Sequence, residues 1–145
     1  IQRIAGADAA HVQILDGDAQ HAMIASNVVL LASGTAALEA MLCKRPMVVG
    51  HRISGLTYAI VKAFGLLKSA HVSLPNILAG KALIPELLQE NCTLEALHAA
   101  LSRWFRDGDA VAALQPEFLA IHETLRRDAS ARAADAIASL LPARA

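Results

Sequence analysis

The sequence predicts an α/β fold in which a parallel sheet is flanked by helices and followed by a helical C-terminal tail. Short apolar runs typical of buried strands alternate with helix-forming runs up to about residue 84, as expected of βαβ units. Beyond that point the apolar residues recur only at helical spacing. The 145 residues are 55% hydrophobic and 18% charged, so the chain can bury a sizeable core.

The first half of the chain supplies the expected strands. The run 12–15 is closed by a turn, Asp-Gly-Asp, whose Asp18 can cap a short helix over 19–26. Residues 28–32 and 47–50 are continuous apolar runs, as expected of strands buried on both faces.

Helices are expected between and after these strands. Residues 36–43 are strong helix formers that end before Pro46. Residues 56–67 form the next predicted helix, and 72–74 form a fourth short strand stopped by Pro75.

The remainder is expected to be helical. Pro85 suits the first position of a helix, and Thr93 can cap the helix after it. Further helices are expected over 109–127, where Pro116 should kink the helix or mark its start, and over 130–141. Trp104 and Phe105 lie on an apolar helical stripe and are predicted to be core residues.

Several function classes find no support in the sequence. The net charge is +0 and aromatic residues make up only 3%, so we expect no nucleic-acid partner. The six histidines show no metal-ligand spacing. The nucleophile elbow and the glycine-rich phosphate loops are also absent. We therefore expect no bound metal and no cofactor.

The strongest candidate site is the stretch Ser33-Gly34-Thr35, which joins the strand over 28–32 to the next helix. In an open parallel sheet, ligands bind beyond the carboxyl ends of the strands, and a helix N-terminus there suits phosphate. Glu39 lies one turn along from Thr35 on the same face, where it can accept hydrogen bonds from a ribose diol. The alternative is that Ser33 or Thr35 only caps the helix.

Further polar residues follow the other predicted strands. Arg52 can hold a phosphate bidentately, although a solvated loop arginine fits the spacing equally well. Asn76 is either a ligand contact or a turn residue. Glu86 is explained by the helix dipole alone, and Gln89 should share its helical face.

Three motifs in series, "ASGTAALEAMLCKRPMVV", "SLPNILAG" and "PELLQE", give the chain a specific resemblance to the lipid-A-disaccharide synthase family. The resemblance covers roughly residues 10–105 and concerns the family's C-terminal half. It differs at three positions: Ala37 stands where Thr is common, His51 where an aromatic is usual and Gly55 where Pro is frequent.

The resemblance implies a glycosyltransferase B fold with a Rossmann-like donor-binding domain over 1–105 and C-terminal helices of the same unit over 106–145. The family transfers 2,3-diacylglucosamine from UDP-2,3-diacylglucosamine to 2,3-diacylglucosamine 1-phosphate (lipid X) and releases UDP. By this resemblance, Ser33, Gly34 and Thr35 face the diphosphate and Glu39 faces the ribose. By the same resemblance, Asn76, Glu86 and Gln89 are expected to line the donor cleft. Arg52 follows the next strand, over 47–50, and so should open onto the same crevice.

The family's N-terminal half, with its catalytic carboxylate, is not in these residues, and the chain begins at Ile1 rather than Met. We therefore expect a processed product, an excised domain or an incomplete chain that binds UDP and cannot turn over alone. The resemblance implies that the protein acts in the cytoplasm, peripherally at the inner face of the cytoplasmic membrane. The sequence leaves open whether the protein forms a homodimer. The alternatives are another UDP-sugar enzyme, such as a UDP-N-acetylglucosamine 2-epimerase, and a non-catalytic nucleotide- or partner-binding module.

Overall fold

The computed structural model describes residues 11–32, 34–55 and 71–140. Within them, β1 (Val29–Leu31), β2 (Met47–His51) and β3 (Glu86–Leu88) form one parallel sheet in the order β1-β2-β3. Val29 pairs with Met47, and Val49 pairs with Glu86. The predicted α/β fold with a parallel sheet is therefore confirmed.

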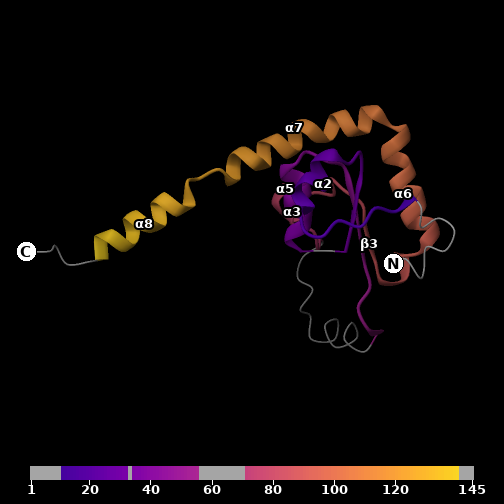
Figure 1. The fold of residues 1–145 in the computed structure, drawn as a ribbon, viewed down its shortest axis with the longest axis horizontal. Coiled ribbons are helices and arrows are strands. Elements are labelled where there is room, and N and C mark those ends of the chain that lie inside the picture. Colours follow the sequence, from indigo (N-terminus) through magenta and orange to yellow (C-terminus); the bar gives the residue numbers. More distant parts are fainter. Residues whose placement is uncertain (1–10, 33, 56–70, 141–145) are drawn as a thin grey trace, which may run out of the picture.

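Helices cover the two faces of this sheet. Figure 1 shows one group of helices on one side and α6 on the other. The group consists of α2 (Ala19–Ala25), α3 (Thr35–Leu42) and α5 (Leu74–Ala79), and α6 spans Leu94–Arg106. Thr93 caps α6 as predicted, because its hydroxyl oxygen accepts a hydrogen bond from the N–H of Ala96.

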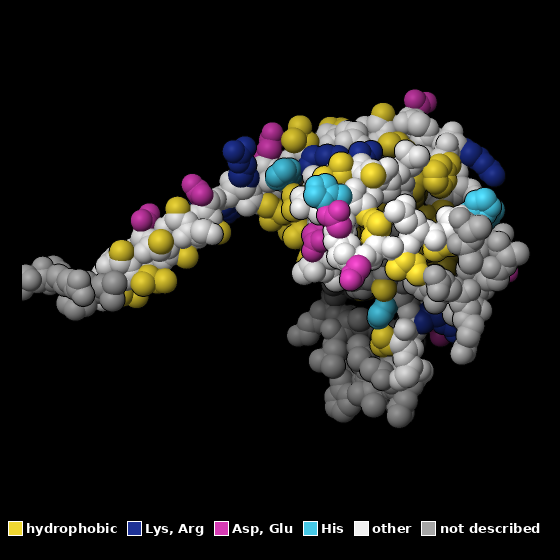
Figure 2. All heavy atoms as spheres, viewed as in Figure 1, with side chains coloured by type: hydrophobic (Ala, Val, Ile, Leu, Met, Phe, Trp, Pro, Cys, Tyr) yellow, Lys and Arg dark blue, Asp and Glu magenta, His cyan; other side chains and the backbone are white. Residues whose placement is uncertain are grey.

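Two helices form the predicted C-terminal tail. α7 (Gly108–Leu125) runs from the end of α6 across to α3 and α5, and α8 (Ala129–Leu140) projects away from the body, as Figure 1 and Figure 2 both show. Pro116 lies inside α7 and does not mark its start. In the described part of the chain, no helix has the length and apolar character needed to cross a membrane.

The core is built around β2. Met47, Val48 and Val49 are fully buried, as expected of a parallel strand covered on both faces. On one side the buried face of α3, with Ala37, Ala40 and Met41, packs against the sheet. On the other side, Trp104 of α6 is buried and its Nε1 donates a hydrogen bond to the carbonyl of Met47 at 3.1 Å.

Two predicted elements are wrong in type. Residues 72–74 form no strand, and α5 begins at Leu74. Pro75 lies in the first turn of this helix, where its missing N–H costs nothing. The expected helix starting at Pro85 is instead β3, whose pairing with β2 overrides the helix-forming tendency of Glu-Leu-Leu.

Three smaller expectations are also wrong, and a fourth cannot be compared with the structure. Residues 12–15 are exposed and form no strand. Asp18 occupies the cap position of α2, but its carboxylate contacts the imidazole of His21 instead of a backbone N–H. Phe105 is 67% exposed and is not a core residue. The helix predicted over 56–67 lies outside the described residues.

Candidate functional site at the carboxyl ends of the strands

The carboxyl ends of the three strands meet at one edge of the sheet because the strands are parallel. Gly34 and Thr35 follow β1, Arg52 follows β2 directly, and Gln89 follows β3. The fold therefore brings these four predicted site residues to the same edge, where ligands of open parallel sheets bind. Ser33 lies outside the described residues.

Gly34 has a backbone conformation that explains why glycine stands there. Its φ of 94° and ψ of −155° lie in a region that essentially only glycine occupies. A Cβ at this position would meet nothing within 4 Å, so backbone conformation, and not crowding, requires the glycine. Gly34 and Thr35, at the start of α3, are both exposed.

Replacing Gly34 by Ala is expected to lower the free energy of unfolding by about 1–2 kcal/mol, because alanine resists this conformation. Chemical denaturation measures the change. Gly108→Ala is the matched control, since a Cβ at Gly108 also meets nothing within 4 Å and Gly108 begins a helix. The control should be neutral or stabilising by up to about 1 kcal/mol. Equal stability of Gly34→Ala and the wild type would contradict the expectation that alanine is strained in the backbone conformation of Gly34.

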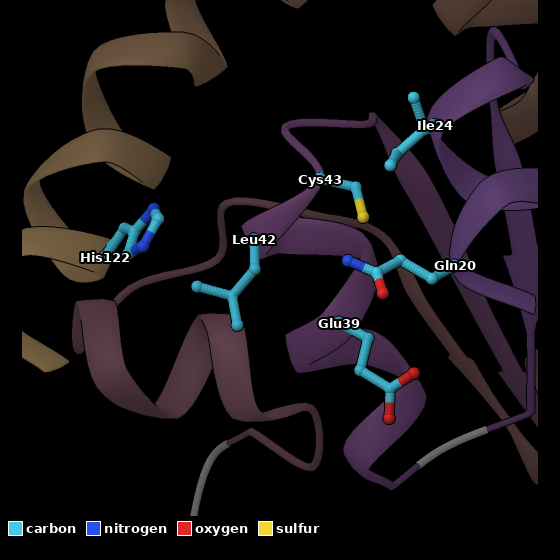
Figure 3. Close-up of a pocket in the computed structure, with 6 residues that line it drawn as sticks. All are labelled: Gln20, Ile24, Glu39, Leu42, Cys43 and His122. Atoms are coloured by element: carbon cyan, nitrogen blue, oxygen red, sulfur yellow. The ribbon is translucent and has the colours of Figure 1, made fainter. Parts of the chain in front are cut away.

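Glu39 lies on the exposed face of α3, as does Thr35 one turn before it. Figure 3 shows its carboxylate directed toward the end of α3 at which the helix begins, as the tilt of helical side chains favours. The first turn of α3 contains no acidic residue, so Glu39 is the only carboxylate of α3 directed toward the positive end of its dipole. This arrangement suits a ligand that carries phosphate and hydroxyl groups together.

A pocket of about 390 Å³ begins at Glu39 and runs along the outer face of α3. Its other lining residues come from α2, the end of α3 and α7: Gln20, Ile24, Leu42, Cys43 and His122 (Figure 3). Glu39 is the one predicted site residue among them. Of the described residues assigned to the sheet edge, namely Gly34, Thr35, Arg52 and Gln89, none lines this pocket.

No motif in the sequence marks Gln20, Cys43 and His122 as pocket residues. His122 in particular lies on α7, which reaches α3 from far along the chain. The Nζ of Lys44 lies 2.9 Å from Nδ1 of His122, 78 residues away. Desolvation lowers the pKa of Lys44, with a smaller opposing effect from Cys43. No local pattern signals this contact.

Asn76 and Glu86 are together, but they bind each other and the backbone. Asn76 is 1% exposed, and its Nδ2 donates to an oxygen of the Glu86 carboxylate at 2.9 Å. The same carboxylate accepts hydrogen bonds from the N–H groups of Val72 and Ser73. The sequence predicts that Glu86 lies on a helix, but it lies in β3. It therefore shares no helical face with Gln89.

Gln89 also uses its side chain within the protein. Its Oε1 accepts a hydrogen bond from the N–H of Ile53 at 3.3 Å, immediately after Arg52. Arg52 itself is exposed. The predicted site residues thus form two groups: Gly34, Thr35, Glu39 and Arg52 are open to solvent, whereas Asn76, Glu86 and Gln89 hold other parts of the chain.

Comparison with known proteins accounts for nearly the whole chain. The sequence model of the lipid-A-disaccharide synthetase family matches residues 2–139. The lipid-A-disaccharide synthase of Xanthomonas axonopodis pv. citri (strain 306) is 63% identical over 131 residues, which is 90% of this chain and 30% of that protein. The synthase of Xylella fastidiosa (strain 9a5c) is 57% identical over 134 residues, 92% of this chain and 35% of that protein.

The chain thus spans about a third of the length of these relatives. The match includes the edge of the sheet, the Gly34 turn and the helices on both faces. The chain belongs to the lipid-A-disaccharide synthetase family.

Proposed function

We propose that this chain is the donor-binding part of a lipid-A-disaccharide synthase. The complete enzyme transfers 2,3-diacylglucosamine from UDP-2,3-diacylglucosamine to lipid X, forms the disaccharide precursor of lipid A and releases UDP. Family membership supports a glycosyltransferase of lipid A synthesis. The assignment of the UDP portion to this chain rests on the geometry at the sheet edge.

The observation that carries the proposal is the segment from Gly34 to Glu39. Gly34 leaves the backbone open at the start of α3, and the dipole of the helix favours a diphosphate there. Glu39 is exposed and directed toward the same helix end (Figure 3), where it can accept hydrogen bonds from the ribose hydroxyls. The hydroxyls of Ser33 and Thr35 and the guanidinium of Arg52 complete the proposed contacts with the donor.

Catalysis is assigned to the part of the complete enzyme that lies outside this chain. The chain matches about a third of its relatives, and the acceptor pocket and the catalytic acid/base carboxylate are assigned to an N-terminal domain outside it. Without that domain we expect UDP binding and no turnover. Because both substrates carry acyl chains, the proposed place of action is the cytoplasmic face of the inner membrane.

The exposure of Gly34, Thr35 and Glu39 also separates this proposal from a non-catalytic module. Such a module would close the turn with its own side chains, whereas Gly34, Thr35 and Glu39 are exposed. The matched family gives no support to a UDP-N-acetylglucosamine 2-epimerase.

Replacing Glu39 by Ala is expected to weaken UDP binding about tenfold to a hundredfold. Hydrogen bonds to a charged group contribute about 1.5–3 kcal/mol, and about 1.4 kcal/mol corresponds to tenfold in affinity. Calorimetric titration of the chain with UDP, without added metal, measures the effect. Ser33→Ala should also weaken binding, since it removes a hydroxyl from the proposed diphosphate contact.

Asp109→Ala is the control for loss of one exposed carboxylate, because Asp109 lies in the first turn of α7. The start of α7 adjoins the end of α6, where Trp104 contacts Met47 at the opposite edge of the sheet. This variant should bind UDP as the wild type does. Unchanged affinity in Glu39→Ala, or no UDP binding by a folded wild-type chain, would contradict the proposed function.

A further inference from the structure

The carboxylate of Glu86, at the start of β3, is almost fully used by hydrogen bonds within the protein. Its side chain is 10% exposed. Oε1 accepts from the N–H of Ser73 at 2.8 Å, from the Ser73 hydroxyl and from Nδ2 of Asn76. Oε2 accepts from the N–H of Val72 at 3.1 Å, and Nδ1 of His71 lies 3.8 Å away. Little capacity remains for a ligand.

The side-chain amide of Asn76 is also saturated. Nδ2 donates to the carbonyl of Ile84 at 3.0 Å and to Glu86. Oδ1 accepts from the N–H groups of Leu83 and Ile84 at 2.8 and 3.0 Å. These are the two donors and two acceptor positions that an asparagine amide offers. Asn76 therefore joins α5 to the chain just before β3 and has no group left for a ligand.

These bonds add a side-chain anchor to the pairing of β3 with β2. β3 has three residues and, among the described residues, pairs only with β2. The Glu86 carboxylate ties the start of β3 to the backbone before α5. At the other end of β3, Gln89 holds the N–H of Ile53, next to Arg52.

We propose that Glu86 and Asn76 are positioning residues for the donor site: they fix β3 so that Gln89 holds the backbone beside Arg52 at the ligand-binding edge. They do not touch the nucleotide. This inference rests on the proposed function, because it assumes that UDP binds at this edge. It differs from the expectation that both side chains line the donor cleft.

Glu86→Gln tests the proposal. The substitution places an NH₂ donor where the carboxylate accepts hydrogen bonds from N–H groups, so β3 should lose its anchor. We expect UDP affinity to fall at least tenfold in calorimetry below the unfolding temperature of the variant. Glu86→Asp, which keeps the charge but is shorter, should show a smaller loss and serves if Glu86→Gln does not fold.

Trp104→Phe is the control for general destabilisation. It removes the indole donor from Met47 at the opposite, amino-terminal end of β2. Its stability should fall while its UDP affinity stays within about twofold of the wild type. Unchanged UDP affinity in folded Glu86→Gln would overturn the proposal and leave Glu86 a purely structural role.

A double-mutant cycle with Gln89→Ala separates positioning from contact. If Glu86 acts through Gln89, the variant that carries both Glu86→Gln and Gln89→Ala should bind UDP with the same affinity as whichever single variant binds UDP less tightly. If Glu86 contacts UDP itself, the two losses multiply, and the proposal is overturned. A folded wild-type chain that does not bind UDP overturns the proposed function and this inference with it, whereas the other outcomes concern the inference alone.

Discussion

Replacing Asn76 by Asp is expected to lower the free energy of unfolding by about 3–5 kcal/mol at neutral pH. The aspartate cannot donate, so the carbonyl of Ile84 loses its partner. A second carboxylate would also lie beside that of Glu86, at a position only 1% exposed. Chemical denaturation of the two proteins measures the difference.

The loss should be smaller at acidic than at neutral pH. Two carboxylates in one site raise the pKa of one of them in the folded state. A group with a raised folded pKa binds more protons in the folded protein, so the variant gains stability as pH falls through that pKa. Asn91→Asp makes the same chemical change at an exposed position and should stay within about 0.5 kcal/mol of the wild type. Similar losses in both variants would contradict the network around Asn76.

The sheet around β2 could be predicted because its local signals agree with its long-range pairing. Residues 47–50 form a continuous apolar run, which is what a parallel strand covered on both faces requires. The turn at Gly34 and the start of α3 follow from the same logic of a strand, a small residue and a helix former. Thr93 could be identified as a cap because the bond it makes spans three residues.

α5 and β3 could not be predicted from local sequence because distant contacts decide them. Glu86-Leu87-Leu88 contains no β-branched residue, yet it becomes a strand by pairing with Val49 and its neighbours. The hydrogen bonds of Glu86 reach residues 10 to 14 positions earlier. A pattern of three residues carries no information about such partners.

The candidate site shows the same division. Its position at the carboxyl ends of the strands follows from topology, and topology follows from the alternation of strands and helices. Which polar side chains stay open depends on their partners in space. Glu39 is exposed because α3 buries its opposite face, whereas Asn76 is buried because the chain before β3 folds over it.

Replacing Phe118 by Ala is expected to lower the free energy of unfolding by about 3–5 kcal/mol, as for other fully buried aromatic residues. Among the residues that the structure describes, Phe118 is the largest fully buried side chain, and it belongs to the central hydrophobic cluster. It lies on α7 between Leu114 and Ile121, the other buried residues of that helix. Its loss leaves a cavity where α7 packs on α3 and α5, and denaturation at constant m-value measures the cost.

Phe105→Ala makes the same change on a side chain that is 67% exposed and should cost less than about 1 kcal/mol. The comparison measures how much the packing of α7 contributes to the stability of the folded body. If α7 belongs to the body, the two variants differ by several kcal/mol, and Phe118→Ala also loosens the contact of His122 with Lys44. Equal, small losses would mean that the sheet and its helices are stable without α7, and that the wall of the Glu39 pocket formed by His122 is dispensable for folding.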